Sequence, residues 1–74
     1  MKKYSVPALE KTLAILELLA NSEAELTTTE IHTALDIPKA TVFMILNVLE
    51  NDEVVVKNLS GRYSIGIKLY NLGM

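Results

Sequence analysis

The chain has 74 residues, of which 50% are hydrophobic, and it carries a formal net charge of −2. This length allows one small domain, and the sparse glycine and proline favour a folded chain over a disordered one. The absence of cysteine excludes disulfides, zinc–thiolate clusters and cysteine nucleophiles, and the single histidine, His32, excludes a histidine-rich metal site. We therefore expect a small folded protein without a cofactor.

The first five residues, Met-Lys-Lys-Tyr-Ser, lack the apolar core of a signal peptide. The longest uncharged apolar stretch, near Val42 to Leu49, is far too short to span a bilayer. These features predict a soluble, cytoplasmic protein with no membrane contact.

A first helix is predicted from Ala8 to Asn21, directly after Pro7. Apolar residues recur through it at spacings of three and four, which is the period of an amphipathic helix. They are Leu9, Leu13, Leu16 and Ala20, with Ile15 and Leu19 beside them. The polar residues 21–25 then form a connection, which leaves room for a very short strand at 25–27.

Residues Thr27 to Leu49 have the layout of a helix-turn-helix, two short amphipathic helices joined by a tight turn. Thr27 stands three residues before Glu30, which is the spacing of a capping box. The first helix of the pair therefore opens at Thr28. It ends before Asp36-Ile37-Pro38, because proline cannot continue a helix but can sit in the first turn of a new one.

The second helix of the pair is predicted over residues 38–51, starting near Lys39. Val42, Ile45, Leu46 and Leu49 repeat at helical spacing and predict one buried stripe. The opposite face is then exposed, as a DNA-reading helix requires. The residues predicted to face outward are Lys39, Ala40, Thr41, Phe43, Met44 and Asn47.

A β-hairpin is predicted over residues 54–65. Val54-Val55-Val56-Lys57 is rich in β-branched residues, Asn58-Leu59-Ser60-Gly61 has turn chemistry, and Arg62-Tyr63-Ser64-Ile65 alternates polar with apolar. Gly66 ends the hairpin. The expected fold is mainly α with a small β-hairpin: a winged helix-turn-helix, with a three-helix core plus a wing, in residues 1–66.

Residues 67–72 begin a further apolar-periodic segment that the chain end cuts short. A helix of barely two turns buries little apolar surface alone. We therefore expect the chain to be a piece of a longer protein.

The outward face of the helix over 38–51 is the first candidate DNA-contacting surface. A helix in the major groove presents its N-terminal residues to base edges and its ends to phosphate. Lys39 can reach guanine or phosphate, and Asn47 can pair with adenine, although it lies two turns into the helix. The other interpretation of this face is an ordinary solvated one.

Phe43 and Met44 are two large apolar residues on this outward face, and three kinds of contact can cover their side chains. They can contact thymine methyl groups, pack half-buried against the wing or the preceding helix, or form a protein interface. For Phe43, partial burial and DNA contact have equal weight.

Four further residues outside this helix are candidate DNA contacts. Thr28 and Thr29 can offer hydroxyls and backbone amides to a phosphate at a helix start, and so can Thr27, which capping alone explains just as well. Lys57 and Arg62 flank the wing and can reach the DNA backbone or the minor groove, although charges bordering a hairpin also serve solubility.

Charge is distributed unevenly along the chain. Residues 1–38 hold three lysines against six acids, giving −3, and residues 39–74 hold three lysines and Arg62 against three acids, giving +1. The negative total counts against nucleic acid, since duplex binding usually requires a basic footprint, but the positive excess lies in the half that would touch DNA.

The order of these pieces resembles the N-terminal winged-helix domain of the IclR family of bacterial and archaeal transcriptional regulators, over nearly the whole chain. The matching strings are Leu9 to Leu19, Thr27-x-x-Glu30-Ile31, Ile37-Pro38-Lys39-Ala40-Thr41-Val42, and Gly61-Arg62-Tyr63-Ser64-Ile65-Gly66 running into Leu69 and Leu72-Gly73. The resemblance places Arg62 in the wing. It also implies a dimeric regulator whose second domain, absent from this chain, binds a small effector and is joined through a linker helix starting in residues 67–74.

Three residues depart from the pattern of that family. His32 and Asp36 stand where alanine and glycine are usual, and Asp tolerates a left-handed backbone better than most residues. Met44 stands where arginine is usual. The resemblance therefore implies a sequence preference different from that of typical members, and a lower affinity.

The sequence leads to one main hypothesis and one alternative. The main hypothesis is sequence-specific DNA binding by a homodimer, with the helix over 38–51 in the major groove and the hairpin over 54–65 as wing. The alternative is a winged-helix module for protein–protein interaction or dimerisation without DNA affinity, which the acidic total, Phe43 and Met44 favour. No catalytic site is predicted, because Glu50, Asp52 and Glu53 have the pattern of a solvated corner.

Overall fold

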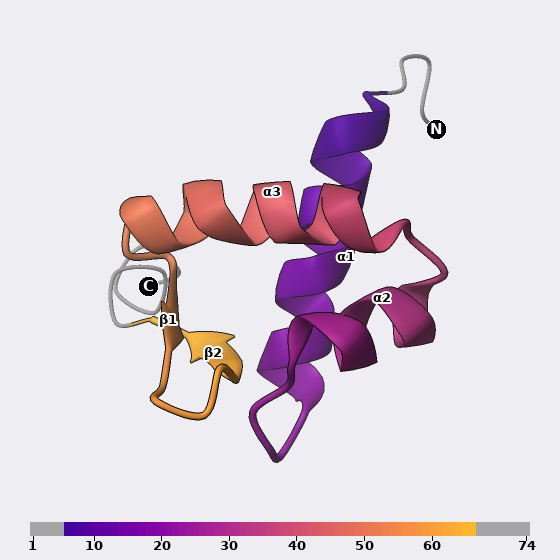
Figure 1. The fold of residues 1–74 in the computed structure, drawn as a ribbon. Helices are drawn as coiled ribbons and strands as arrows, with labels where there is room; N and C mark the ends of the chain where they lie inside the picture. Colours follow the sequence, from indigo (N-terminus) through magenta and orange to yellow (C-terminus); the bar gives the residue numbers. More distant parts are fainter. Residues whose placement is uncertain (1–5, 67–74) are drawn as a thin grey trace.

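The computed structural model describes residues 6–66, which form three helices followed by a two-stranded hairpin (Figure 1). The elements are α1 (Pro7–Asn21), α2 (Thr28–Leu35), α3 (Lys39–Asn51), β1 (Val55–Lys57) and β2 (Tyr63–Ile65). This is the predicted winged helix-turn-helix, and each predicted helix lies within one residue of its observed bounds. The predicted linker-helix start at 67–74 lies outside the described residues.

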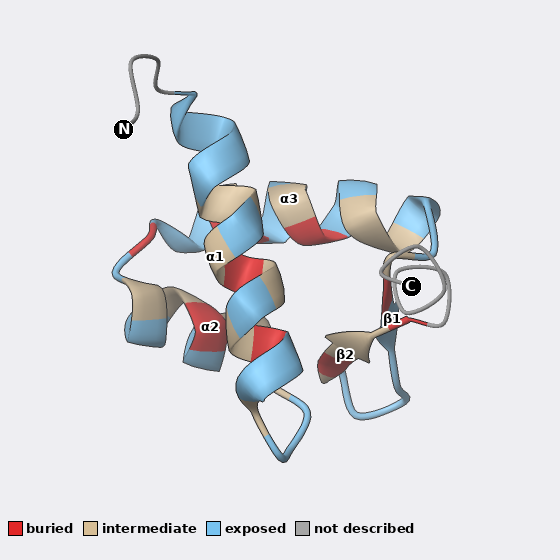
Figure 2. Ribbon diagram, turned by 180° about the vertical axis from the view of Figure 1, so that it is seen from behind, coloured by how far each residue is buried: buried red, intermediate tan, exposed pale blue. Residues whose placement is uncertain are grey.

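Helix α1 carries its buried residues in its second half. Ile15 is fully buried and Leu19 nearly so. Leu9 and Leu13, two of the recurring leucines, are 53% and 51% exposed because the first half of α1 extends beyond the other helices (Figures 1 and 2). The periodicity therefore predicted the helix, but only part of its apolar surface is covered by residues 6–66.

Helix α2 begins with the predicted capping box. The backbone N–H of Glu30 donates to Thr27 Oγ1 at 3.1 Å, and the backbone N–H of Thr27 donates to Glu30 Oε1 at 2.9 Å. These two bonds satisfy donors that a helix start otherwise leaves unpaired.

Two residues, His32 and Asp36, determine the geometry of the turn between α2 and α3. Asp36 adopts the left-handed conformation, with φ 57° and ψ 43°, which Asp tolerates better than most residues. The His32 ring Nδ1 lies 3.1 Å from the carbonyl oxygen of Ile37. The His32 side chain therefore links α2 to the turn through the Ile37 carbonyl, and Asp36 reverses the backbone so that α3 can begin.

Helix α3 buries the predicted stripe. Val42 and Leu46 are fully buried, and Ile45 and Leu49 pack against the core while remaining partly exposed. The core lies where α1, α2 and α3 face one another and continues into the hairpin (Figure 2). Its eight buried residues are Ile15, Leu19, Ile31, Ile37, Val42, Leu46, Val55 and Tyr63.

The hairpin pairs β1 and β2 antiparallel, with Val55 opposite Ile65 and Lys57 opposite Tyr63. An isolated bridge between Leu26 and Tyr63 extends this ladder to the segment before α2, where room for a very short strand was predicted. Gly66 closes the hairpin at a place where a Cβ atom would lie 2.5 Å from the carbonyl oxygen of Glu53. Only glycine allows this approach.

Candidate nucleic-acid interface

The outward face of α3 is exposed in the folded domain. Five of the six residues predicted to point outward are exposed, and Thr41 is partly buried. The five are Lys39, Ala40, Phe43, Met44 and Asn47. In Figure 1, α3 crosses the near side of the molecule, with α2 and the hairpin on the same side. The exposed face of α3 is therefore free to approach a large partner together with those two elements.

An open hollow of about 590 Å³ connects α3 with the start of α2 and the tip of the wing. It is lined by Thr27, Thr28, Thr29, Lys39, Ala40, Phe43 and Gly61. Five of these, Thr28, Thr29, Lys39, Ala40 and Phe43, were predicted separately as DNA contacts. Folding thus brings the start of α2, the start of α3 and the wing to one surface, which we call the α3 surface.

Phe43 and Met44 point to different sides of α3. Phe43 is 51% exposed and lines the hollow beside α2 and the wing. Met44 is 61% exposed and lines a smaller hollow of about 230 Å³ toward α1, together with Thr12 and Val48. Phe43 therefore lies half-covered within the α3 surface, and Met44 lies at its edge.

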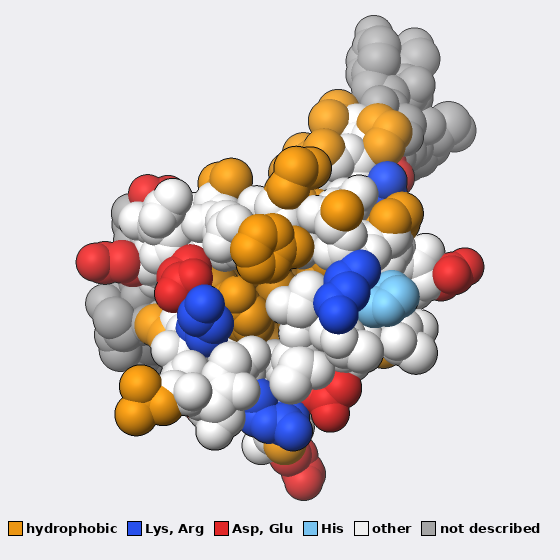
Figure 3. All heavy atoms as spheres, in the orientation of Figure 1, with side chains coloured by type: hydrophobic (Ala, Val, Ile, Leu, Met, Phe, Trp, Pro, Cys, Tyr) orange, Lys and Arg blue, Asp and Glu red, His pale blue; other side chains and the backbone are white. Residues whose placement is uncertain are grey.

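Lysine and arginine side chains border an apolar centre on this side of the molecule, and acidic side chains lie next to some of them (Figure 3). Four cations occur in residues 6–66, and three of them, Lys39, Lys57 and Arg62, belong to α3 or the wing. Lys39 is exposed and makes no ion pair with another described residue. Glu50, Asp52 and Glu53 lie at the far end of α3, and across residues 6–66 no His, Asp and Glu side chains are grouped to hold a metal ion.

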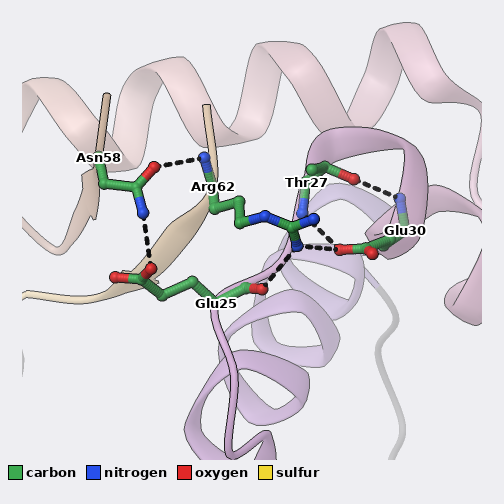
Figure 4. Close-up of polar contacts among 5 residues, drawn as sticks. All are labelled: Glu25, Thr27, Glu30, Asn58 and Arg62. Carbon is green, nitrogen blue, oxygen red and sulfur yellow. Dashed lines mark hydrogen bonds and ion pairs between the residues drawn. The ribbon is translucent and has the colours of Figure 1, made fainter. Parts of the chain in front are cut away.

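The two wing cations have different surroundings. Lys57 Nζ lies 5.8 Å from the centre of the Tyr63 ring, in a cation–π arrangement. Arg62 Nη1 donates to Glu30 Oε1 at 3.0 Å and to the carbonyl oxygen of Glu25 at 3.2 Å (Figure 4). Arg62 is thus held by the segment at the start of α2, an arrangement that sequence reasoning did not find.

Asn58 organises the turn of the wing. Its Oδ1 accepts hydrogen bonds from the backbone N–H groups of Ser60 and Arg62 at 2.9 and 3.0 Å. Its Nδ2 donates to Glu25 Oε1 at 2.6 Å (Figure 4). Gly61 completes the turn with φ 79°, a conformation that favours glycine.

Glu30 is the shared acceptor between the capping box and the wing. The hydrogen bond from the Thr27 backbone and the positive charge of Arg62 hold the pKa of the Glu30 carboxyl below its usual value. Glu30 is therefore ionised at neutral pH, and its charge is paired with a cation at the edge of the α3 surface.

The helix-turn-helix region has the sequence pattern of a known family. Residues 8–59 match the IclR helix-turn-helix domain. The chain belongs to this family. IclR helix-turn-helix domains are the DNA-binding parts of transcriptional regulators, so this chain is a DNA-binding domain of a transcriptional regulator. The match provides no support for the alternative of a module without DNA affinity.

Full-length IclR regulators are similar to the chain over most of its length. It is 36% identical over 70 residues to the glycerol operon regulatory protein of Streptomyces coelicolor, and 36% identical over 67 residues to the transcriptional repressor AllR of Klebsiella pneumoniae. The matches cover 93% and 89% of this chain but only 28% and 25% of those proteins. The chain therefore spans about a quarter of the length of these relatives.

Solved structures of IclR regulators share the fold. The regulator from Alicyclobacillus acidocaldarius superposes with a TM-score of 0.89 at 35% identity, covering 95% of this chain and 29% of that one. The repressor BlcR of Agobacterium tumefaciens superposes with a TM-score of 0.83 at 29% identity, covering 92% of this chain and 27% of that one.

Within residues 6–66, no helix is both long and apolar enough to cross a membrane.

Proposed function

We propose that this IclR domain binds duplex DNA sequence-specifically by placing α3 in the major groove, with the wing against the flanking backbone. The observation that carries the proposal is the α3 surface, where the exposed face of α3 and the wing lie on one side of the core. Lys39 on this surface makes no ion pair within residues 6–66. A helix fits the major groove of B-DNA, and the side chains near its N-terminus reach the base edges.

Contacts to bases come from the first turns of α3 in this proposal. Lys39 and Thr41 stand in its first turn, Ala40 and Phe43 line the hollow, and all of them precede Asn47. Lys39 donates to guanine or phosphate, and the Phe43 ring packs against thymine methyl groups. Asn47 lies a full turn beyond Phe43 and reaches bases only if α3 enters the groove along its axis.

Contacts to phosphate come from α2 and the wing. Thr28 and Thr29 lie in the first turn of α2, where exposed N–H groups and the helix dipole favour an anion. Lys57 is the exposed cation of β1. These contacts fix the register of the domain on the duplex but carry no sequence information themselves.

The whole protein, in this proposal, is a cytoplasmic homodimeric transcriptional regulator with a second, effector-binding domain. The relatives, named as an operon regulatory protein and a repressor, are about four times as long as this chain, which supports further domains. Leu9 and Leu13 in α1 are half exposed, and we propose that a second copy of the domain covers them in the dimer.

The test is a titration of the domain onto random-sequence duplex DNA at several salt concentrations. A DNA binder loses affinity steeply with salt, with a log–log slope of about −0.9 for each phosphate contacted. No binding at low salt by a correctly folded domain would contradict the proposal.

Substitution of Lys39 tests whether the α3 surface contacts DNA. Lys39→Ala is expected to lower affinity and to make the slope shallower by about 0.9, because one phosphate-neutralising charge is lost. The matched control is Lys11→Ala, which removes a lysine from α1 outside the α3 surface and is expected to leave the slope unchanged. If both substitutions changed the slope equally, the assignment of the DNA contact to α3 would be contradicted.

A further inference from the structure

We propose that Arg62 is a positioning residue, which holds the wing against the start of α2 through Glu30, and that its partner in the DNA complex remains this carboxylate and not a DNA phosphate. The inference rests on the proposed DNA binding but assigns Arg62 a role different from the phosphate or groove contact that its place in the wing predicts.

The guanidinium of Arg62 is already engaged by two acceptors. Arg62 Nη1 donates to Glu30 Oε1 at 3.0 Å and to the Glu25 carbonyl oxygen at 3.2 Å. The Glu25 carbonyl belongs to the segment that leads into α2, and Glu30 lies in the first turn of α2; both are more than 30 residues away in the sequence (Figure 4). The side chain therefore crosses from the wing to α2 and joins two elements of the α3 surface.

The acceptor carboxylate is itself fixed. Glu30 Oε1 also accepts the backbone N–H of Thr27 at 2.9 Å, so the capping box determines where this oxygen lies. A preorganised acceptor lowers the entropic cost of holding a long arginine side chain in one geometry. Arg62 thus meets a carboxylate that is in place before DNA arrives.

Moving Arg62 onto a phosphate would leave an ionised carboxylate uncompensated beside the DNA backbone. Glu30 lies in the first turn of α2, whose start lines the hollow of the α3 surface. An unpaired negative charge at this place repels the phosphates that Thr28 and Thr29 are proposed to approach. Pairing with Arg62 neutralises Glu30 and keeps this part of the surface compatible with DNA.

The same contact sets the position of the wing tip. Gly61, the residue directly before Arg62, lines the same hollow as Phe43. Asn58 ties the other side of the turn to Glu25, and the backbone bridge between Leu26 and Tyr63 fixes the start of β2. The wing is therefore fastened on both sides of its turn, and Lys57 remains its cation without a carboxylate partner among the described residues.

The experiment compares salt slopes and affinities on a fixed duplex for Arg62→Ala, Lys57→Ala and Glu30→Gln. Arg62→Ala is expected to weaken binding about two- to fivefold, the range for losing one exposed ion pair, and to change the salt slope by much less than the loss of a phosphate contact does. Lys57→Ala is expected to make the slope shallower by about 0.9, because Lys57 is the wing contact to phosphate.

Glu30→Gln separates the two roles of Arg62. Glutamine still accepts the Thr27 N–H, so the capping box stays, but the ion pair is lost. Removing a negative charge near DNA would by itself strengthen binding, whereas loss of wing positioning weakens it. We expect Glu30→Gln to weaken binding, and the double variant Glu30→Gln/Arg62→Ala to lose no more affinity than Arg62→Ala alone.

Three results bear on the inference. A slope shallower by about 0.9 for Arg62→Ala, with unchanged or tighter binding by Glu30→Gln, would overturn it and assign Arg62 to a phosphate. Urea unfolding of each variant checks that the domain stays folded. If Arg62→Ala unfolds, the affinity of Glu30→Gln alone still tests the inference. Absence of DNA binding by the unaltered domain would overturn the proposed function as well.

Discussion

At the scale of single residues, Phe43 and Met44 illustrate what helical periodicity can predict. The 3.6-residue period identified both as outward-facing, and both are more than half exposed. It did not indicate that Phe43 faces the wing and Met44 faces α1, because those neighbours lie far away in the sequence. Two adjacent residues on one exposed face therefore have different surroundings and different expected roles.

Met44 offers a substitution that adds affinity. The family resemblance implies an arginine at this position, and Met44 is 61% exposed, so an arginine fits without repacking the core. Met44→Arg is expected to tighten DNA binding and to steepen the log–log salt slope by about 0.9, since one more phosphate is neutralised.

The control for Met44→Arg places the same charge elsewhere. Ala20 is exposed near the end of α1, which lies behind α3 in Figure 1 and in front in Figure 2. Ala20→Arg is expected to leave the slope unchanged. A similar steepening for both variants would show that net charge, and not the position of residue 44, determines the affinity.

At the scale of elements, the start of α2 was predictable and its connection to the wing was not. The capping box of Thr27 and Glu30 is a local pattern that spans three residues. The contacts of Arg62 with Glu30 and of Asn58 with Glu25 join residues 32 and 33 positions apart. No local spacing encodes such pairs, because they depend on how the hairpin packs against the helices.

The capping box makes a measurable contribution to stability. Thr27→Ala removes the acceptor for the Glu30 N–H and is expected to lower the free energy of unfolding by about 1 kcal/mol. Thr29→Ala, in the exposed first turn of the same helix, is expected to change it by less than about 0.5 kcal/mol. Urea unfolding at pH 7 measures both, and equal effects would contradict a capping role for Thr27.

The lowered pKa of Glu30 makes the stability of the domain depend on pH in the acid range. Because the folded-state pKa lies below the usual value of 4.5, this contribution to stability is complete above pH 4.5 and is lost as the pH falls through the folded value. The unaltered domain is expected to lose stability more steeply than Glu30→Gln below pH 4.5. If the free energy of unfolding of the unaltered domain and of Glu30→Gln changed in parallel with pH, a lowered pKa of Glu30 would be contradicted.

At the scale of the whole molecule, the order of elements was predictable because each has a local signature. Helical periodicity, a capping box, a proline in the turn and β-branched runs gave three helices and a wing, and residues 6–66 have this arrangement. The extent of the core was not predictable. Leu9 and Leu13 follow the helical period but remain half exposed, since periodicity does not reveal how far the partner elements reach.

The structure shows where the positive charges of the described residues lie. All nine acids of the chain lie within the described residues, against four cations, yet three of those cations belong to α3 and the wing. One of them, Arg62, is paired with Glu30, which leaves Lys39 and Lys57 for phosphate. Affinity at physiological salt is therefore expected to be modest for the isolated domain.

The central claim, that α3 lies in the major groove, is tested most directly by dimethyl sulfate protection of guanine N7, an atom exposed only in that groove. The DNA is a site selected from a random-sequence pool, saturated with the domain at low salt. We expect protection of guanines within the site, weakened in Lys39→Ala and kept in Lys11→Ala. Full methylation of every N7 while the domain is bound would contradict it.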